Sequence, residues 1–267
     1  MIEKGNSNIY IDNIDELEYN VSRIYNFKKL AKNVYLNIYN IPGLNDSSYK
    51  DLYFNYIENN FHKFDIILFV VDINSALNTS DEIEILTKII NNCKSNNVKY
   101  GIYNKLLVIA NKCDNMSIDE HNNLILEEEP NEMFEQIKTQ VKQKVQEIYP
   151  KLEYNIIPMS AEDSFVYRIL EKNSAYNLNI KYINKFGYNE YGRNRWNRLS
   201  LEQKKKQIKK LIPKCNIEST LTLTGFNGFK QIFEKYLSLE NQKKFVINHI
   251  KYTHSKSLEN VEKLFIK

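Results

Sequence analysis

Long apolar runs are missing from this chain. Its longest, Ile66–Val71, is far shorter than the roughly 20 residues of a membrane-spanning helix. The first residues, Met1–Asn6, lack the apolar core that a signal peptide carries. These two absences predict a soluble protein of the cytoplasm.

Cysteine is rare as well. The three cysteines, Cys93, Cys113 and Cys215, are odd in number and far apart, which argues against a disulfide framework. Neither the cysteines nor the four histidines show the spacing of zinc ligands. We therefore expect reduced thiols and assign the histidines no role.

Glycine and proline are scarce, whereas Asn, Ile, Lys and Tyr are abundant, as AT-rich coding would produce. The hydrophobic content of 42% comes in periodic blocks, which predicts a folded core. A net charge of +4 is small for this length and does not by itself demand an anionic partner. No linker-like stretch divides the chain, so we expect one domain with elaborations.

Four short apolar runs have the character of β-strands, at residues 34–39, 66–71, 106–110 and 154–159. The second and third are almost uniformly apolar, which is typical of strands covered on both faces. This pattern predicts a parallel sheet.

Helical patterns lie between the strands. Thr79 and Glu82 form a capping box ahead of one apolar stripe, and a second stripe starts at Phe134 and stops before Pro150. A third helix is expected over roughly residues 49–61. Alternating strands and helices predict a doubly wound α/β fold, whose ligand lies in the loops at the carboxyl ends of the strands.

The third strand runs into the tetrapeptide Asn111-Lys112-Cys113-Asp114. The Asp114 carboxylate could accept two hydrogen bonds from the ring NH and the amino group of guanine, whereas adenine offers no such pair of donors. Asn111 would tether neighbouring loops, and the stem of Lys112 would lie over the base. The simpler interpretation is a polar turn after a strand.

Two further motifs follow strand ends: Asn40-Ile41-Pro42-Gly43-Leu44 and Ser160-Ala161-Glu162-Asp163. With the tetrapeptide, their order resembles the switch-II, base-specificity and S-A loops of the translation-factor-related class of P-loop GTPases. The proline-glycine-leucine form is most similar to dynamin-like large GTPases. The resemblance covers about residues 34–161 and implies binding of GTP or GDP with Mg²⁺. It implies that the Ala161 NH meets the guanine carbonyl and that the Gly43 NH meets the γ-phosphate.

The phosphate-binding motif of that family, G-x-x-x-x-G-K-[S/T], is missing from the sequence. Its nearest match, Gly187–Asn194, has neither the lysine nor the hydroxyl and is read as a loop with two glycines. Asn40 stands where the family has an aspartate that holds Mg²⁺ through water, and a neutral amide oxygen is a poorer, second-sphere partner. Leu44 cannot orient a water molecule. We name no catalytic residue.

A missing first strand would leave a gap in the sheet between residues 34–39 and 66–71, with unpaired edges. The gap could be filled by residues 8–11, by a partner chain, or by a segment encoded upstream in a split or truncated reading frame.

The second half carries a basic region, Lys185–Lys214, in which Tyr188, Tyr191 and Trp196 are interleaved with Arg and Lys. Such a region could bind nucleic acid or an anionic membrane surface. The simpler interpretation is a helix capped by Ser200 whose lysines face solvent.

The sequence thus predicts a three-layer P-loop NTPase-like G domain with a mostly parallel sheet, its first strand and P-loop missing, and extra C-terminal helices. We expect a single G-like domain over residues 1–267, with a motif-bearing core at 34–161, a basic helical elaboration at 162–220 and closing helices at 221–267. Two functions remain open: binding of guanine nucleotide with impaired hydrolysis, and a scaffold that binds no nucleotide and acts through a partner. A third hypothesis is a competent GTPase completed by a separate segment.

Overall fold

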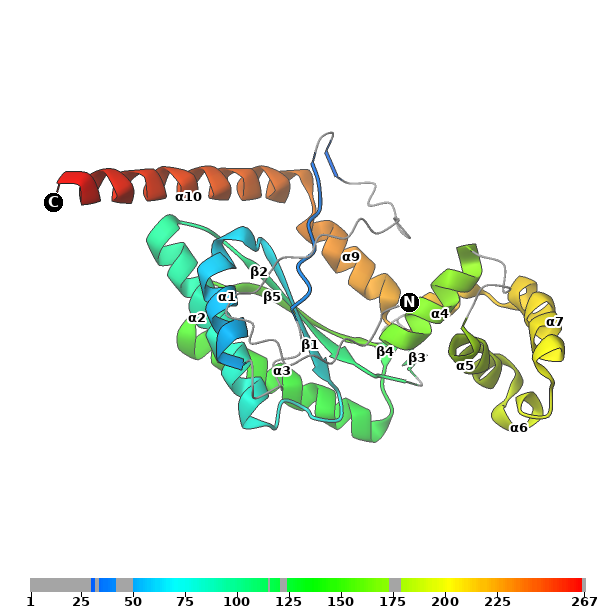
Figure 1. Ribbon diagram of the computed structural model, residues 1–267. Coiled ribbons are helices and arrows are strands. Elements are labelled where there is room, and N and C mark those ends of the chain that lie inside the picture. Colours follow the sequence, from blue (N-terminus) through cyan, green and yellow to red (C-terminus); the bar gives the residue numbers. More distant parts are fainter. Residues whose placement is uncertain are drawn as a thin grey trace, which may run out of the picture. The chain divides into compact units, whose positions relative to one another are not determined.

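The computed structural model describes residues 30–31, 34–41, 50–114, 116–120, 124–172 and 179–265. They group into two compact units. Figure 1 labels their helices and strands. The first unit holds the described residues up to Asp65, together with residues 95–103 and those from Ser238 onward, and the second holds residues 66–94 and 104–237. Whether the chain is one G-like domain remains a prediction.

The second unit is built on a three-stranded parallel sheet in the order β1-β2-β5. Its strands are β1 (Ile66–Asp72), β2 (Lys105–Asn111) and β5 (Glu153–Met159). The strands begin and end in register, since Ile66 pairs with Lys105 and Asp72 with Asn111. A short antiparallel pair, β3 (Ser117–Ile118) and β4 (Leu124–Ile125), follows β2. The expected parallel sheet and its three strands are confirmed.

The predicted helices flank this sheet. They are α2 (Ser80–Tyr100), which runs on into the first unit, and α3 (Glu128–Ile148). The Glu82 N–H donates to Thr79 Oγ1 at 3.3 Å, so the expected cap of α2 is present. In α3, the buried stripe is Phe134, Ile137, Val141 and Val145. The α/β fold class with helices on the sheet is therefore as predicted.

The elaboration after β5 is helical. Its elements are α4 (Ala161–Lys172), α5 (Ile180–Tyr191), α6 (Arg193–Trp196), α7 (Leu201–Leu211), η3 (Ile212–Lys214), α8 (Ile217–Leu223) and α9 (Phe226–Tyr236). Helices α5, α6 and α7 form a group at the end of the unit away from β1 (Figure 1). They pack around Trp196, whose side chain is fully buried in a cluster with Ile183 and Phe186.

The first unit contains α1 (Lys50–Asn60), the short η1 (Phe61–Lys63) and the long α10 (Leu239–Phe265). In it, the imidazole of His62 stacks on the ring of Tyr252, with centroids 3.9 Å apart. His249 Nε2 lies 3.2 Å from Asp65 Oδ2. These contacts hold α10 against η1 and against Asp65. The helix expected over residues 49–61 and the expected closing helices are confirmed.

Two strand predictions are wrong. Residues 34–39 form no strand, and Tyr35 and Ile38 are 77% and 79% exposed. An apolar run needs a hydrogen-bonded neighbour to become a strand, and the described residues provide none there. The expected burial of β1 on both faces is also wrong, because Leu68 and Val70 are 42% and 55% exposed.

The near match to a phosphate loop is not a loop between strand and helix. Gly187 lies inside α5, where an added Cβ would stand 1.9 Å from Trp196 Cε2. Gly192, with φ of 83°, separates α5 from α6. Both glycines therefore serve the packing and the turn of the helical group, which corrects the expected two-glycine loop.

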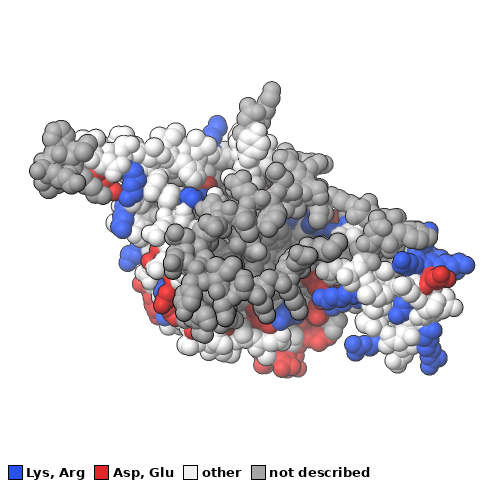
Figure 2. Space-filling view, in the orientation of Figure 1, with Lys and Arg blue, Asp and Glu red and all other residues white. Residues whose placement is uncertain are grey.

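The basic region follows the simpler interpretation. Ser200 and Gln203 form the expected capping box of α7, and Ile208 is buried beneath it. Lysine and arginine side chains gather over α6 and α7 in Figure 2. Because Trp196 is buried, it is not available to stack on a nucleobase. Among the described residues, no helix is both long and apolar enough to cross a bilayer.

Candidate base-recognition site

The three strands of the sheet end side by side. Asp72, Asn111 and Met159 are paired across the sheet at its carboxyl edge. The Asn111 tetrapeptide and the Ser160 loop start there, so the fold brings two of the three sequence motifs together. In a parallel sheet this edge is where ligands bind.

Asn111 ties the two loops to each other. Its Oδ1 accepts a hydrogen bond from the Ala161 N–H at 3.0 Å, and its backbone oxygen accepts one from Ile73 N–H at 2.9 Å. The tethering expected of Asn111 is thus present. The Ala161 N–H, the donor expected to meet a guanine carbonyl, is here engaged by Asn111.

Lys112 adopts a left-handed backbone conformation, with φ of 67°. Such conformations are uncommon outside glycine and concentrate at functional sites. Its ammonium pairs with Asp72 at the end of β1. This hydrogen bond raises the pKa of Lys112. For Asp72, burial opposes ionisation, but hydrogen bonds from Lys112 and Asn74 hold the pKa of the carboxyl below its usual value.

Asp114 projects from the end of the tetrapeptide, and its side chain is 54% exposed. Its Oδ1 accepts a hydrogen bond of 2.8 Å from the hydroxyl of Ser160. Ser160 therefore orients Oδ1 of Asp114, and Oδ2 is the oxygen that can accept bonds from other groups. This leaves a carboxylate that a ligand with paired N–H donors could reach.

Ser160 is buried and is shared by two carboxylates. Its Oγ lies 2.8 Å from Asp114 Oδ1 and also 2.8 Å from Asp163 Oδ2, in the first turn of α4. The Ser160 N–H donates to Thr224 O at 2.9 Å, which anchors this loop to α8. A carboxylate in the first turn of a helix is favoured by the helix dipole, so Asp163 also has a structural role in α4.

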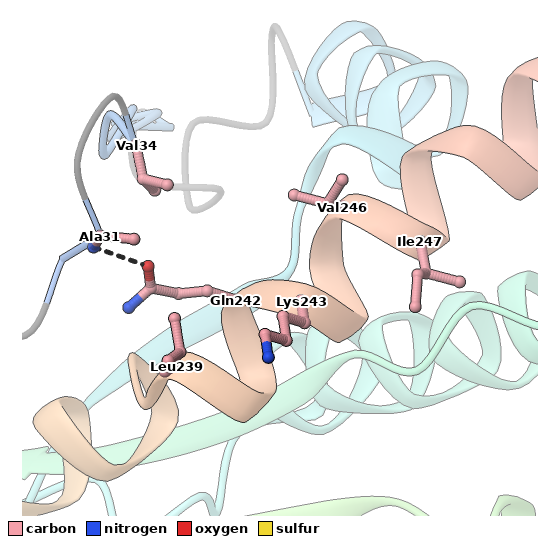
Figure 3. Close-up of a pocket in the computed structure, with 7 residues that line it drawn as sticks. All are labelled: Ala31, Val34, Leu239, Gln242, Lys243, Val246 and Ile247. Carbon is pink, nitrogen blue, oxygen red and sulfur yellow. Dashed lines mark hydrogen bonds between the residues drawn. The ribbon is translucent and has the colours of Figure 1, made fainter.

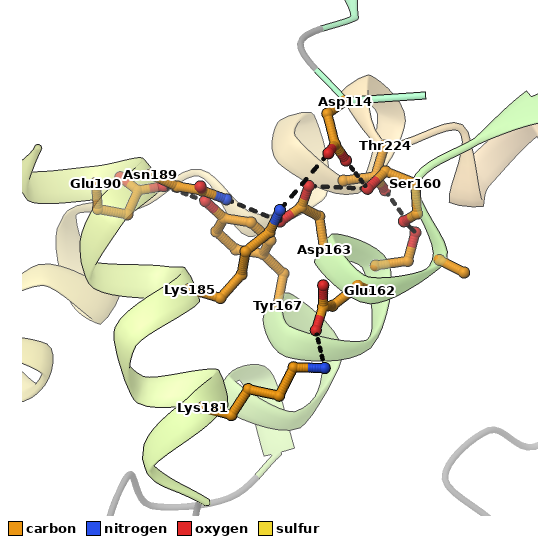
Figure 4. Close-up of polar contacts among 12 residues, drawn as sticks. Asp114, Ser160, Glu162, Asp163, Tyr167, Lys181, Lys185, Asn189, Glu190 and Thr224 are labelled. Atoms are coloured by element: carbon orange, nitrogen blue, oxygen red, sulfur yellow. Dashed lines mark hydrogen bonds and ion pairs between the residues drawn. The ribbon is translucent and has the colours of Figure 1, made fainter. Parts of the chain in front are cut away.

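Helix α5 reaches the same carboxylates, as Figure 4 shows. Lys185 Nζ lies 3.4 Å from Asp163 Oδ1 and 3.8 Å from Asp114 Oδ2. One turn later, Asn189 Nδ2 donates to Asp163 Oδ1 at 2.9 Å. The basic region thus contributes to the site through its first lysine.

Two further predicted residues, Gly43 and Asn40, are not part of the second unit. Gly43, with Pro42 and Leu44, lies outside the described residues. Asn40 is exposed and belongs to the first unit. Within the described part of the chain, no group of three or more His, Cys, Asp or Glu side chains could hold a metal ion.

Four contributors were missed from the sequence: Asp72, Asp163, Lys185 and Asn189. Asp72 could have been found, because it ends an apolar strand in the same way as Asn111. Asp163 carries the signal of a capping residue after Ser160. Nothing in the sequence pattern links Lys185 or Asn189 to Asp114, because that contact depends on how α5 packs.

A separate hollow of about 370 Å³ lies in the first unit, between Ala31 and Val34 and one face of α10 (Figure 3). The Ala31 N–H donates to Gln242 Oε1 at 3.0 Å across it. Most of its lining side chains are apolar, so it offers little for recognition of a base or phosphate.

Comparison with known proteins agrees with the strand-end motifs. Residues 7–169 match the sequence model of the Gtr1/RagA G protein conserved region, and this stretch contains the Asn111 tetrapeptide and the Ser160 loop. No curated protein and no solved structure matches the chain. Members of G-protein families bind GTP or GDP with Mg²⁺, and a match over more than half of the chain identifies the ancestry of the domain. The chain belongs to the Gtr1/RagA family of G proteins.

Proposed function

We propose that this G domain binds guanine nucleotides through its base-recognition half and binds their phosphates poorly. The observation that carries the proposal is the convergence of Asn111, Asp114, Ser160 and Ala161 at the carboxyl edge of the sheet. Each belongs to a motif expected to read guanine, and each contacts another member of the set.

Base selection would depend on Asp114. Its carboxylate accepts the ring NH and the exocyclic amino group of guanine, while Ser160 holds one of its oxygens in place. A charge-assisted hydrogen bond contributes about 1.5–3 kcal/mol, and adenine would leave the carboxylate without both donors. We therefore expect strong discrimination against adenine nucleotides.

Ligand binding would require rearrangement of existing contacts. The Ala161 N–H must exchange Asn111 Oδ1 for the guanine carbonyl, and the Lys112 stem must cover the base while its ammonium is paired with Asp72. Exchange of one satisfied hydrogen bond for another contributes little net free energy. The base site alone should therefore bind nucleotide only moderately.

The sequence features expected to bind phosphate support slow GTP hydrolysis. The printed sequence has no G-x-x-x-x-G-K-[S/T] motif, so the backbone cradle, lysine and hydroxyl that bind phosphate and Mg²⁺ are not provided by it. Asn40 would hold Mg²⁺ weakly and through water, and Gly43 would offer one backbone N–H to a γ-phosphate. We assign no catalytic residue. The proline-glycine-leucine form of residues 42–44 is our reason for proposing a dynamin-like character within the family.

A scaffold that binds no nucleotide is the second candidate. It is favoured by the exposed Leu68 and Val70 of β1, an apolar surface on which a partner could pack. It is also favoured by the fact that the atoms expected to meet guanine already have partners within the protein. A competent GTPase completed by a separate P-loop segment at this strand is the third candidate. The basic face of α7 could bind nucleic acid or a membrane.

Competition binding distinguishes these candidates. Fluorescent GDP would be titrated with the purified chain, with unlabelled GDP, GTP and ATP as competitors, in Mg²⁺ and in chelator. Nucleotide binding with a poor phosphate half predicts displacement by GDP and GTP but not by ATP, and little dependence on Mg²⁺. Absence of binding at high micromolar nucleotide would contradict it and favour the scaffold.

A further inference from the structure

A single ammonium group stands between the two carboxylates of the base-recognition site. Lys185 Nζ lies 3.8 Å from Asp114 Oδ2 and 3.4 Å from Asp163 Oδ1. The Lys185 side chain is only 25% exposed, and that of Asp163 only 11%. The Lys185–Asp163 pair is therefore screened by water less than surface pairs are, whereas the Asp114 side chain of the other pair is 54% exposed.

The single hydrogen of the Ser160 hydroxyl explains why a cation is needed between the two carboxylates. The hydroxyl of Ser160 lies 2.8 Å from both carboxylates but has one hydrogen, so it donates to only one of them at a time. The other carboxylate then faces an oxygen lone pair. Lys185 is positioned to offset this repulsion, because it faces the remaining oxygen of each carboxylate.

Helix α5 is firmly placed to present this lysine. Lys185 and Asn189 are four residues apart and therefore lie on one face of the helix, and both reach Asp163. The residue after Asn189, Glu190, accepts a 2.6 Å hydrogen bond from the hydroxyl of Tyr167 in α4. Phe186 packs its ring edge against Tyr167 and is buried.

The distances also leave Asp114 able to bind a ligand. The 3.8 Å separation from Lys185 is an ion-pair distance and not a hydrogen bond, so it does not occupy the lone pairs of Oδ2. A carboxylate offers about four acceptor positions, of which Ser160 takes one. The ring NH and amino group of guanine can be accommodated by the others.

We propose that Lys185 is a positioning residue of the guanine site, which holds the Asp114 carboxylate toward the base and sets the preference for the 2-amino group. This inference rests on the proposed function. Lys185 acts through Asp114 and contacts no part of the nucleotide itself.

The test compares GDP with IDP, which lacks the 2-amino group. In Lys185→Met, the stem is kept and the charge removed, so both bonds from Asp114 to guanine should weaken. We expect GDP affinity to fall about tenfold, IDP affinity to fall less, and the ratio of the two affinities to shrink. Lys185→Arg should recover most of the ratio.

Lys181→Met is the matched control. Lys181 lies one turn earlier on α5 and pairs with Glu162 at 2.6 Å, without contacting Asp114. It should leave both affinities unchanged. Lys185→Gln serves as a second neutral variant, and circular dichroism of each variant confirms folding before titration.

The outcomes separate the two levels of the proposal. Equal losses for GDP and IDP, or no loss, in the neutral Lys185 variants would overturn the positioning role while nucleotide binding by the unaltered chain stands. If the unaltered chain binds neither GDP nor IDP, the proposed function is wrong and the role of Lys185 falls with it.

Discussion

Asn111 and Ala161 are joined by a 3.0 Å hydrogen bond from the Ala161 N–H to the Asn111 side-chain oxygen. The bond links the end of β2 to the start of α4, and so holds the two candidate base-recognition loops together. It also shows that one residue can organise the site while engaging the backbone donor that a nucleobase would use.

Asn111→Ala removes this tether. We expect a loss of about 1 kcal/mol in the free energy of unfolding, typical of one hydrogen bond that becomes open to solvent. Urea denaturation measures it. Asn91→Ala is the control, because Asn91 is exposed and its side chain bonds to Thr87 O of its own helix. A similar loss in both variants would contradict a specific role for the tether.

Gly187→Ala should destabilise the helical group. An alanine Cβ would lie 1.9 Å from the fully buried ring of Trp196, and such overpacking costs about 1–3 kcal/mol. Thermal unfolding followed by Trp196 fluorescence reports it directly. Gly228→Ala in α9 is the matched control, because nothing lies within 4 Å of its added Cβ. It should be neutral or stabilise by up to about 1 kcal/mol through helix propensity. Equal melting temperatures for the two variants would refute the packing account.

His249 should make the stability of the first unit depend on pH. The hydrogen bond with Asp65 raises the pKa of His249, against the effect of burial. A raised folded-state pKa stabilises fully below the unfolded-state value of about 6.5, and the contribution is lost as pH rises through the higher folded-state pKa. The stability difference between the unaltered chain and His249→Gln should therefore be larger at pH 5.5 than at pH 8.5.

His62 provides the opposite case. Burial, and then the charges of Lys63, His249 and Lys256, lower the pKa of His62, while a backbone hydrogen bond opposes this. Its neutral form stabilises above the unfolded-state pKa, and this contribution is lost as pH falls. The stability difference between the unaltered chain and His62→Gln should therefore change with pH in the opposite direction to the difference for His249→Gln. Circular dichroism at several pH values checks both, and slopes of the same sign would contradict the assignment.

The sequence predicted the parts of the fold whose signal is local. Uniformly apolar runs such as residues 106–110 became central strands, and the Thr79 and Ser200 caps began helices where expected. Residues 34–39 have a similar pattern but no neighbouring strand among the described residues, and a pattern cannot reveal whether a neighbour exists. Gly187 resembled part of a phosphate loop only in spacing, because its role is decided by the indole that packs on it.

The candidate site was also predicted only where its signal is local. Asn111, Asp114 and Ser160 could be placed because they lie at or just beyond strand ends, and parallel strands bring such residues to one edge. Lys185 could not, since its contact with Asp114 depends on the packing of α5 against α4 through Tyr167. A contact between a strand end and a helix that packs beside it leaves no periodic pattern in the sequence.

The central claim is that Asp114 reads a guanine base, and exchange of its carboxylate tests this most directly. The Asp114→Asn variant would be titrated with fluorescent GDP and with XDP as competitor, beside the unaltered chain. An asparagine amide donates to the 2-carbonyl of xanthine but no longer accepts both guanine donors. We predict at least a tenfold loss of GDP affinity together with a gain in XDP affinity. GDP binding that is unchanged in the variant, or an affinity of the unaltered chain for ADP equal to that for GDP, would contradict base recognition at this site.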